Sequence, residues 1–382
     1  MIYVDNACTS HPKAPGVPQA VKDILEQGCF NINRGGYAGA YEMSALVFDT
    51  REKIAALFDC PTGRQVVFTS GITHALNIAL KGLLRPGDHV VTTQMEHNAV
   101  IRPLGQLQTQ GVTVDTARCG PDGRLDLSDM EAKITERTKI VVMSHASNVC
   151  GAILPIREAG EICRKRGALL LVDSAQTAGV LPISMRQDNI DILAFAGHKG
   201  LLAVQGIGGL VLSQGIADKM IPLIAGGTGS HSHIADMPSE LPDRLEAGTL
   251  NIPGIAALSA ALDYIKKIGT DTIYTREMKL LSRLTDGLSA VSGVRLVGPE
   301  NPMDKCAIAA LDFPALDNAA ISARLDEEYG IMTRCGLHCA PTAHKALGTF
   351  PRGVVRCSLG HLNTEAEIDE LLVALRQITR IG

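Results

Sequence analysis

The feature that most constrains the fold is a run of short apolar segments that alternate with amphipathic helices between residues 60 and 215. The apolar segments are rich in Val, Ile and Leu with little alternation, which is typical of strands covered on both faces. Helices at 74–84 and 156–166 are examples of the intervening elements. This alternation predicts a three-layer α/β domain around a mainly parallel sheet. We predict its strands at 65–69, 89–93, 112–116, 139–143, 168–172, 190–194 and 208–212.

The carboxyl-terminal part of the chain predicts a second, smaller α+β unit. Its last helix begins at Thr364 and Glu367, which match a capping box. The stretch 226–245, rich in Gly, Ser and Pro, predicts a mobile surface loop. We therefore expect a large domain over 15–260 and a small domain formed by 1–14 and 261–382. The remaining expected elements are helices at 255–268, 274–291 and 319–329 and strands at 294–297, 307–311 and 354–358.

The composition narrows the class of protein. The chain has 382 residues, 46% of them hydrophobic, and a formal net charge of −4 with interspersed acidic and basic residues. This charge balance gives no indication of a nucleic-acid or membrane-surface partner. No apolar stretch reaches the roughly 20 residues of a spanning helix, and the amino terminus is typical of a strand, not of a signal peptide. We expect a soluble, cytoplasmic protein.

The ten cysteines are scattered and form no CxxC pair. In a reducing cytosol most of them are expected to be small buried hydrophobes without disulfides. Cys335, His338 and Cys339 lie close together in sequence, but further metal ligands at usable spacing are missing. We therefore predict no metal site and favour a catalytic thiol in this segment.

Two predicted strands are followed by side chains of complementary chemistry. Asp173 follows the strand at 168–172, and Lys199 follows the strand at 190–194. Such folds bind their ligands beyond the carboxyl ends of the strands. A lysine forms a Schiff base with the aldehyde of pyridoxal phosphate, and a carboxylate keeps its pyridine nitrogen protonated. The apolar surroundings of Lys199 favour the free amine. The pair predicts pyridoxal phosphate as the cofactor.

A strand–helix turn follows the strand at 65–69. Free backbone N–H groups at the start of a helix bind phosphate well. An ordinary helix cap is the alternative, but the presence of Asp173 and Lys199 favours a phosphate cradle for the cofactor. Its predicted members are Ser70, Gly71, Ile72 and Thr73.

Polar residues after other strands complete the predicted cofactor site. His97 is expected to stack on the cofactor ring and to carry protons, and Asn148 and Gln176 to donate to its phenolic oxygen. His198 is expected to contact the phosphate or to orient the lysine. Ordinary loop side chains are the alternative for these residues. For Asp173 the alternative is an N-cap of a following helix.

These motifs resemble the class V aminotransferase family of pyridoxal-phosphate enzymes, and within it the cysteine desulfurase and selenocysteine lyase branch of the Suf type. The resemblance implies the fold of type I pyridoxal-phosphate enzymes, in which the small domain carries the catalytic cysteine loop and the substrate arginine. The match runs nearly end to end, over 3–7, 33–35, 69–77, 96–99, 144–151, 172–176, 197–199, 246–251 and 356–359.

The resemblance also implies roles for single residues. Thr249 resembles the residue that contacts the cofactor phosphate of the other subunit, which implies a homodimer with shared active sites. Arg356 resembles the clamp for the substrate α-carboxylate, Arg334 a second active-site arginine, and Asn148 a further carboxylate contact. Cys339 resembles the catalytic nucleophile of a short loop, with Arg334 and His338 as cationic neighbours that favour a thiolate.

The implied reaction converts L-cysteine to L-alanine and leaves the sulfur on Cys339 as a persulfide, with Lys199 and His97 as proton carriers. A sulfur-acceptor protein is then a further partner. The alternatives are a selenocysteine lyase acting on L-selenocysteine, a class V aminotransferase or β-eliminating lyase, and a non-catalytic partner of sulfur assembly. Three features depart from the family pattern: Cys8 replaces an alanine, Ala196 replaces a serine or threonine, and the stretch 203–206 lacks a proline.

Overall fold

A seven-stranded sheet forms the centre of the larger part of the molecule. The computed structural model describes residues 1–32 and 35–380, so Asn33 and Arg34 of one predicted motif lie outside the described residues. The predicted α/β class is confirmed, and every predicted strand of this sheet is found within two residues of its expected bounds. The strand order is β2-β8-β7-β6-β5-β3-β4. The strands are β2 (Val66–Thr69), β3 (His89–Thr93), β4 (Thr113–Ala117), β5 (Thr138–Ser144), β6 (Leu169–Asp173), β7 (Ile192–Ala196) and β8 (Gly208–Leu212).

One strand of this sheet runs against the others. β8 is antiparallel to both of its neighbours, β7 and β2, while the remaining pairs are parallel. The reversal of β8 makes β2 parallel to β7, although the two strands are far apart in sequence. The carboxyl ends of β2, β3, β5, β6 and β7 therefore lie on the same edge of the sheet.

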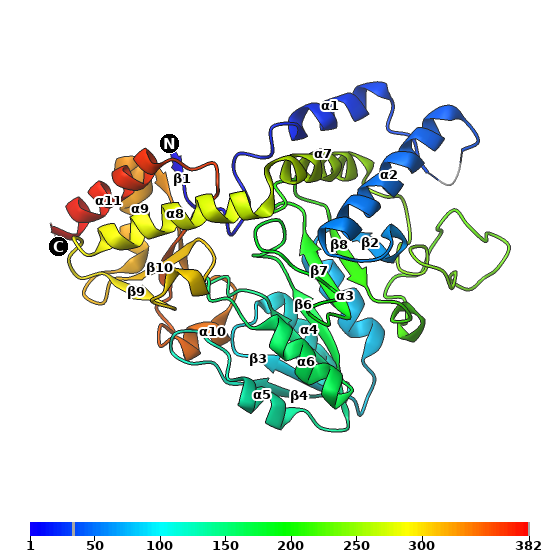
Figure 1. The fold of residues 1–382 in the computed structure, drawn as a ribbon, viewed down its shortest axis with the longest axis horizontal. Helices are drawn as coiled ribbons and strands as arrows, with labels where there is room; N and C mark the ends of the chain where they lie inside the picture. The colour runs from blue at the N-terminus through cyan, green and yellow to red at the C-terminus, as the bar shows by residue number, and fades with distance from the viewer. Residues whose placement is uncertain (33–34, 381–382) are drawn as a thin grey trace.

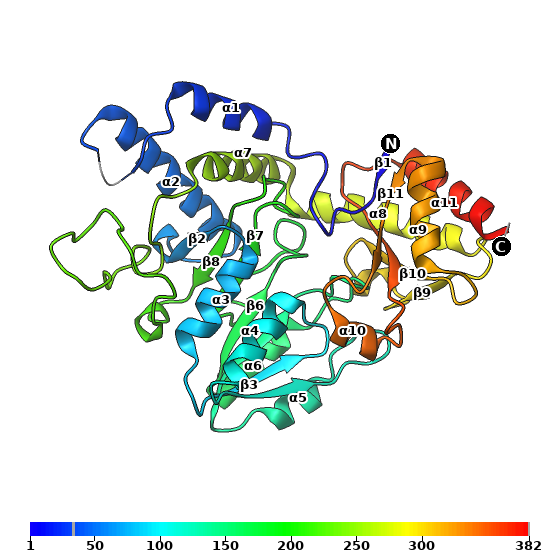
Figure 2. The same ribbon diagram turned by 180° about the vertical axis from the view of Figure 1, so that it is seen from behind.

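Both faces of the sheet are covered by helices, as the apolar strands predicted. Leu171 belongs to the hydrophobic cluster on one face, and its neighbours Leu170 and Val172 belong to the cluster on the other. The first cluster includes α3 (Ile72–Leu83) and α4 (Asn98–Gln108). The second includes α1 (Val17–Gln27), α2 (Ala38–Leu57), α5 (Leu127–Lys133), α6 (Ile156–Arg166) and α7 (Ile252–Ile268). Figures 1 and 2 show α6 on one side of the sheet and α3 and α4 on the other.

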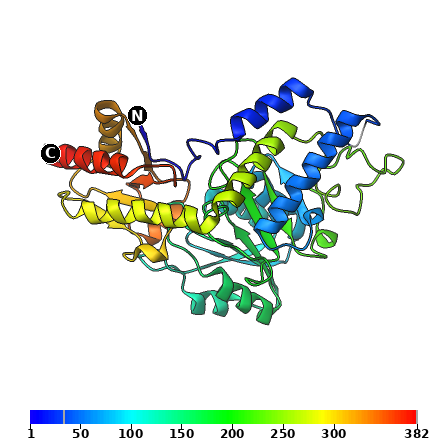
Figure 3. The ribbon, with the colours of Figure 1, turned by 45° about the horizontal axis from the view of Figure 1, so that its top comes forward.

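The smaller unit is built around an antiparallel sheet with the order β12-β13-β10-β9. Figure 3 shows α8 extending from the large unit along this sheet. The amino-terminal strand β1 (Ile2–Tyr3) pairs with β11 (Ile331–Met332), so the start of the chain lies with its end. The predicted bounds of the two domains, 15–260 against 1–14 with 261–382, remain a prediction. The elements are α8 (Thr270–Leu288), β9 (Arg295–Val297), β10 (Ile308–Asp312), α9 (Asn318–Tyr329), β12 (Arg334–Gly336), α10 (Pro341–Ala346), β13 (Val354–Ser358) and α11 (Glu365–Arg380).

Two local predictions concern the surface. At the start of α11, Thr364 Oγ1 accepts the N–H of Glu367 at 3.2 Å, and Glu367 Oε2 accepts the N–H of Thr364 at 2.8 Å, so the capping box is confirmed. The stretch 226–245 contains turns and bends but no helix or strand, and its mobility remains a prediction. Within residues 1–32 and 35–380, no helix is long and apolar enough to cross a membrane.

Candidate active site

The predicted site residues from the large unit meet at one edge of its sheet. They follow the carboxyl ends of β2, β3, β5, β6 and β7, which all lie on that edge. A cavity between the two units is lined by Lys199 and Gln176 from this edge and by Ser358 and Glu277 from the small unit. The large and small units therefore each contribute a wall of the site.

Lys199 and Asp173 have the environment that the sequence predicted. Asp173 ends β6, is 3% exposed, and accepts the N–H of Ala175 at 2.9 Å. Burial raises the pKa of this carboxyl, and a neighbouring cation would favour its ionised form. Burial lowers the pKa of the Lys199 amine, while Asp173 acts in the opposite direction. A turn, not a helix, follows Asp173, so the alternative interpretation of this residue as a helix N-cap is wrong.

The start of α3 is open to an anion. Gly71 is the N-cap, and no side chain caps this helix. Gly71 has φ +152°, and a Cβ placed on it would meet no atom within 4 Å, so space is free in front of the helix. Ser70 Oγ lies 3.3 Å from His74 Nδ1, and His74 Nε2 is buried without a partner. An uncapped N-terminus with free space fits a phosphate group.

His97 is the N-cap of α4. Its Nδ1 accepts the N–H of Ala99 at 3.0 Å. Burial, and then the positive charge of Lys199, lowers the pKa of His97 to about 4, so the ring is neutral at neutral pH. The preceding residue, Glu96, is completely buried and accepts the N–H and the hydroxyl of Ser144 at 3.0 and 2.9 Å. Glu96 thus ties the end of β3 to the end of β5 and fixes the place of His97.

The other predicted cofactor contacts of the large unit lie near the same edge. Asn148 donates its Nδ2 to the carbonyl of His338 at 2.7 Å, and its Oδ1 is buried without a partner. Gln176 donates to the carbonyl of Ala7 at 3.2 Å. Burial lowers the pKa of His198 to about 4, and its Nδ1 is buried without a partner. Burial of a polar atom without a hydrogen-bond partner costs free energy. The unpaired atoms here are therefore suited to bind a ligand.

The small unit contributes the loop that holds Cys339. The thiol is exposed, and its Sγ lies 3.8 Å from Nη2 of Arg334. The carbonyl of Cys339 accepts the N–H of Asn98 at 2.7 Å, next to His97 at the start of α4. His338 and Cys339 have φ +48° and +56°, in the left-handed region that few side chains adopt. The loop that holds the predicted nucleophile is therefore bonded to the helix start that bears His97.

One expectation about this loop is wrong. His338 is 2% exposed, and it donates Nε2–H to the carbonyl of Arg334 at 3.2 Å. Burial lowers its pKa to about 2, so the ring carries no positive charge near the thiol. Arg334 therefore supplies the positive charge at Cys339, and His338 instead orders the loop.

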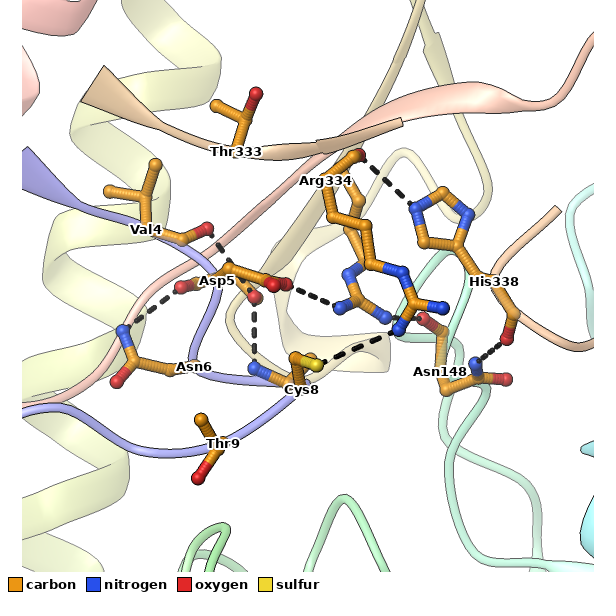
Figure 4. Close-up of polar contacts among 12 residues, drawn as sticks. Val4, Asp5, Asn6, Cys8, Thr9, Asn148, Thr333, Arg334 and His338 are labelled. Carbon is orange, nitrogen blue, oxygen red and sulfur yellow. Dashed lines mark hydrogen bonds and ion pairs between the residues drawn. The ribbon is translucent and has the colours of Figure 1, made fainter. Parts of the chain in front are cut away.

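Arg356 lies at the back of the site on β13. Its guanidinium is 1% exposed, donates Nη1 to the carbonyl of Asn148 at 2.8 Å, and pairs through Nη2 with Asp5 at 2.6 Å. Its Nε is buried without a partner. Figure 4 shows Asp5, Arg334 and Asn148 in this part of the site. Asp5 was part of a recognised motif, but the sequence alone did not assign it as the counter-ion of Arg356.

The amino-terminal segment passes between the two walls of the site. Asn6 N–H bonds to the carbonyl of Ser358 at 3.1 Å, in the small unit. Ser10 N–H bonds to the carbonyl of His198 at 2.9 Å, in the large unit next to Lys199. Cys8 lies between these two anchors. The position of this segment could not be derived from strand and helix patterns.

One predicted site residue lies outside this cluster. Thr249 is exposed and, among residues 1–32 and 35–380, shares no polar contact with the strand-end side chains of its own chain. This position is compatible with a role in another subunit, which remains a prediction. In those same ranges, no group of three or more His, Cys, Asp or Glu side chains has the geometry to hold a metal ion.

Comparison with known proteins identifies the family. Residues 2–371 match the family model described as "Aminotransferase class-V". The chain therefore belongs to the class V aminotransferase family, whose members depend on pyridoxal phosphate. The buried Asp173, the amine of Lys199 and the open start of α3 fit that cofactor.

The relatives place the chain in the cysteine desulfurase family. It is 32% identical to a probable cysteine desulfurase of Methanothermobacter thermautotrophicus, over 100% of this chain and 95% of the relative. It is 33% identical to a cysteine desulfurase of Synechococcus elongatus, over 99% of this chain and 60% of that protein. The apo structure of a cysteine desulfurase from Thermococcus onnurineus has 32% identity and a TM-score of 0.93, over 100% of this chain and 95% of that one.

Proposed function

We propose that this protein is a pyridoxal-phosphate-dependent cysteine desulfurase that converts L-cysteine to L-alanine and leaves the sulfur on Cys339 as a persulfide. The observation that carries the proposal is the position of an exposed thiol, 3.8 Å from a guanidinium, on a loop bonded to the helix start that bears His97. The family membership supports the same reaction.

The cofactor would be held by residues of the large unit. The uncapped start of α3, with Ser70 to Thr73, would bind the phosphate, together with His198. Asp173 would pair with the pyridine nitrogen, and Asn148 and Gln176 would bind the phenolic oxygen. His97 is neutral and partly buried, which suits a ring that stacks on another ring.

The chain's own residues then bind the substrate and move its protons. When bound, pyridoxal phosphate supplies an electron sink for the pair left at the substrate Cα. The unprotonated amine of Lys199 takes the α-proton, since burial favours its neutral form. Nε of Arg356, which has no partner in the protein, is a donor for the substrate carboxylate, with Arg334 beside it.

Cys339 performs the sulfur transfer. Its thiolate attacks the sulfur of the substrate, an S–S bond forms, and the Cβ–S bond breaks. The electron pair that remains at Cβ takes a proton, which gives the methyl group of alanine. Arg334 stabilises negative charge on the attacking sulfur. Because Cys339 is exposed, an acceptor protein can remove the sulfur from outside.

A homodimer with shared sites is part of this proposal. Large apolar side chains are exposed on α2 and in the segment 221–234. Exposed apolar patches of this kind indicate protein contacts. These side chains include Tyr41, Phe48, Ile221, Ile224 and Ile234. Thr249 would reach the cofactor phosphate of the partner subunit. Mixed dimers of Lys199→Ala and Thr249→Ala subunits would then contain one site free of both changes. Regained cofactor affinity in the mixture supports sharing, and unchanged affinity contradicts it.

A paired assay tests the reaction. Wild-type protein and Cys339→Ala are each given L-cysteine and then L-selenocysteine, and alanine, pyruvate and released sulfide or selenide are quantified. The exposed Cys29, which follows α1, provides the matched control variant Cys29→Ala. We expect alanine from L-cysteine in wild type and in the control, and a fall of about 10²-fold or more in Cys339→Ala.

Other outcomes identify other enzymes. Alanine from L-selenocysteine alone, unaffected by Cys339→Ala, would indicate a selenocysteine lyase. Pyruvate in place of alanine would indicate a β-eliminating lyase. Transfer of the amino group to a keto acid would indicate an aminotransferase. Each of these results contradicts the proposed desulfurase.

A further inference from the structure

Cys8 is a second thiol in the active site. It stands in the amino-terminal segment, two residues before the N–H of Ser10 that bonds to the carbonyl of His198. A negative charge on its sulfur would raise the pKa of the Lys199 amine. On its other side, the backbone carbonyl of Asp5 accepts the N–H of Cys8 at 3.0 Å, and the Asp5 carboxylate pairs with Arg356 at 2.6 Å. Both flanks of Cys8 are therefore fixed to side chains or loops of the site.

One guanidinium joins Cys8 to the predicted nucleophile. Nη1 of Arg334 lies 3.7 Å from Sγ of Cys8, and Nη2 lies 3.8 Å from Sγ of Cys339. Figure 4 shows Cys8 pointing from its segment toward Arg334. The two terminal nitrogens of a guanidinium point in different directions. One guanidinium can therefore stabilise negative charge on two sulfurs at once. The two thiols thus share one positive charge.

The other cysteines lack this arrangement. Cys335 precedes Cys339 by four residues, but its side chain packs against the hydrophobic core of the small unit. Cys150, Cys163, Cys306 and Cys357 are buried, and Cys29 is exposed after α1. Among the described residues, Cys8 and Cys339 are the two cysteines whose sulfur contacts Arg334. Position and charge therefore select Cys8 from the remaining thiols.

We propose that Cys8 is a second sulfur-accepting thiol, which takes the outer sulfur of the Cys339 persulfide. The inference rests on the proposed function, because Cys339 must first receive sulfur from the substrate. The thiolate of Cys8 attacks the outer sulfur, a new S–S bond forms at Cys8, and the S–S bond at Cys339 breaks. Cys339 leaves as a thiolate, and no oxidant or reductant is consumed. Arg334 stabilises the attacking thiolate and then the leaving one.

The transfer would give the site two sulfur positions with different access. Cys339 is exposed, and Cys8 is partly buried between the two units. A sulfur atom held on Cys8 is farther from solvent thiols, while Cys339 is free to accept another atom from a second substrate molecule. The enzyme would therefore hold more sulfur per site than one catalytic cysteine allows.

Mass spectrometry locates the sulfur. Cofactor-loaded protein is treated with L-cysteine without acceptor or reductant, the persulfides are trapped by alkylation, and the chain is cut with trypsin. Cys8 is the single cysteine in the peptide 1–13, whereas Cys339 shares the peptide 335–345 with Cys335. We expect an added sulfur atom on Cys8 and on Cys339 but not on Cys335. In Cys339→Ala, Cys8 should carry none.

Several results would overturn the proposal. An unmodified Cys8 beside a modified Cys339 contradicts the transfer but leaves the desulfurase intact. Sulfur on Cys8 in Cys339→Ala contradicts the order of transfer. A disulfide between Cys8 and Cys339 with released sulfide shows attack on the inner sulfur instead. If Cys339 carries no sulfur and no alanine forms, the proposed function itself fails.

A burst experiment gives an independent measure. Without an acceptor, alanine forms only until the accepting thiols are loaded. The burst of alanine in wild type should be about twice that of Cys8→Ser or Cys8→Ala, since each of these variants keeps one accepting thiol. Cys29→Ser serves as the matched control and should show the wild-type burst. Equal bursts in wild type and both Cys8 variants would overturn the proposal.

Discussion

The two walls of the site are built in different ways. In the large unit, Asp173 is the last residue of a strand and Lys199 and His97 follow strands, and these strands are buried on both faces. In the small unit, Cys339 is exposed on a loop with two successive residues at positive φ. The first wall fixes groups that act on protons and on the cofactor. The second wall presents a thiol that must receive a sulfur atom and then surrender it.

This difference shows how one site combines precision with access. Proton transfer requires heavy atoms within hydrogen-bond reach, and a packed sheet holds such positions well. A sulfur carrier must be reached by another molecule, and loops on a rigid scaffold are suited to that task. The hydrogen bond from Asn98 to the carbonyl of Cys339 holds the loop of the accessible thiol against the rigid wall.

Removal of the amine from the rigid wall should have the largest effect. Lys199→Ala is expected to lower the rate of alanine formation by about 10³-fold or more, because the proton carrier at Cα is lost. The visible absorbance of the lysine-bound cofactor should disappear as well. Lys267→Ala, an exposed position on α7, is the control and should resemble wild type. Substantial alanine formation by Lys199→Ala would contradict the assignment.

Removal of the counter-ion behind the second wall should affect stability next. Asp5→Ala leaves the buried guanidinium of Arg356 without its carboxylate, which is expected to cost about 3 kcal/mol of unfolding free energy. Denaturant titration measures this change. Asp263→Ala breaks an exposed ion pair with Lys53 and should cost under about 1 kcal/mol. Equal losses in the two variants would show that burial of the pair does not matter.

A buried carboxyl between the two walls should make stability depend on pH. Burial raises the pKa of Glu277 on α8 from 4.5 to about 8. The folded protein therefore keeps a proton that the unfolded chain releases, and unfolding is favoured as the pH rises from about 5 to 8. Relative to Glu277→Gln, the unfolding free energy of the wild type should fall by roughly 1.4 kcal/mol per pH unit in this window. The exposed Glu370→Gln is the control, and a flat difference between wild type and Glu277→Gln would contradict this account.

The smallest expected effect concerns a part of the small unit outside the chemistry. Thr364→Ala removes one half of the capping box of α11 and should cost about 1 kcal/mol of unfolding free energy. The rate of alanine formation should not change, because the box contacts no site residue. Thr272→Ala, at an exposed position within α8, serves as the control for the loss of a threonine. A change in the rate of alanine formation would show that the start of α11 affects the wall of the site in the small unit.

The rigid wall could be predicted from the sequence to a large extent. Buried parallel strands are apolar throughout, and a polar residue directly after such a strand marks the edge where ligands bind. Asp173 and Lys199 were located by that rule alone. The helices α1 and α2 were not predicted.

The second wall could not be derived in this way. Arg334, Cys339 and Arg356 were identified through a family resemblance, since no periodic pattern places an irregular loop against a distant sheet. The pairing of Asp5 with Arg356 joins residues from opposite ends of the chain. The neutral state of His338 depends on burial, which neighbours in sequence do not reveal.

The reversed strand β8 has a consequence for the order of folding during synthesis. β2 pairs only with β8 among the described strands, and β8 is made much later in the chain. Strand pairing over a long sequence separation is slow because the intervening chain must first be ordered. Because β8 lies between β2 and β7, the turn after β2 reaches its place in the sheet only after β8 has left the ribosome. A nascent chain that ends before Gly208 would hold the lysine at the end of β7 but no organised phosphate cradle.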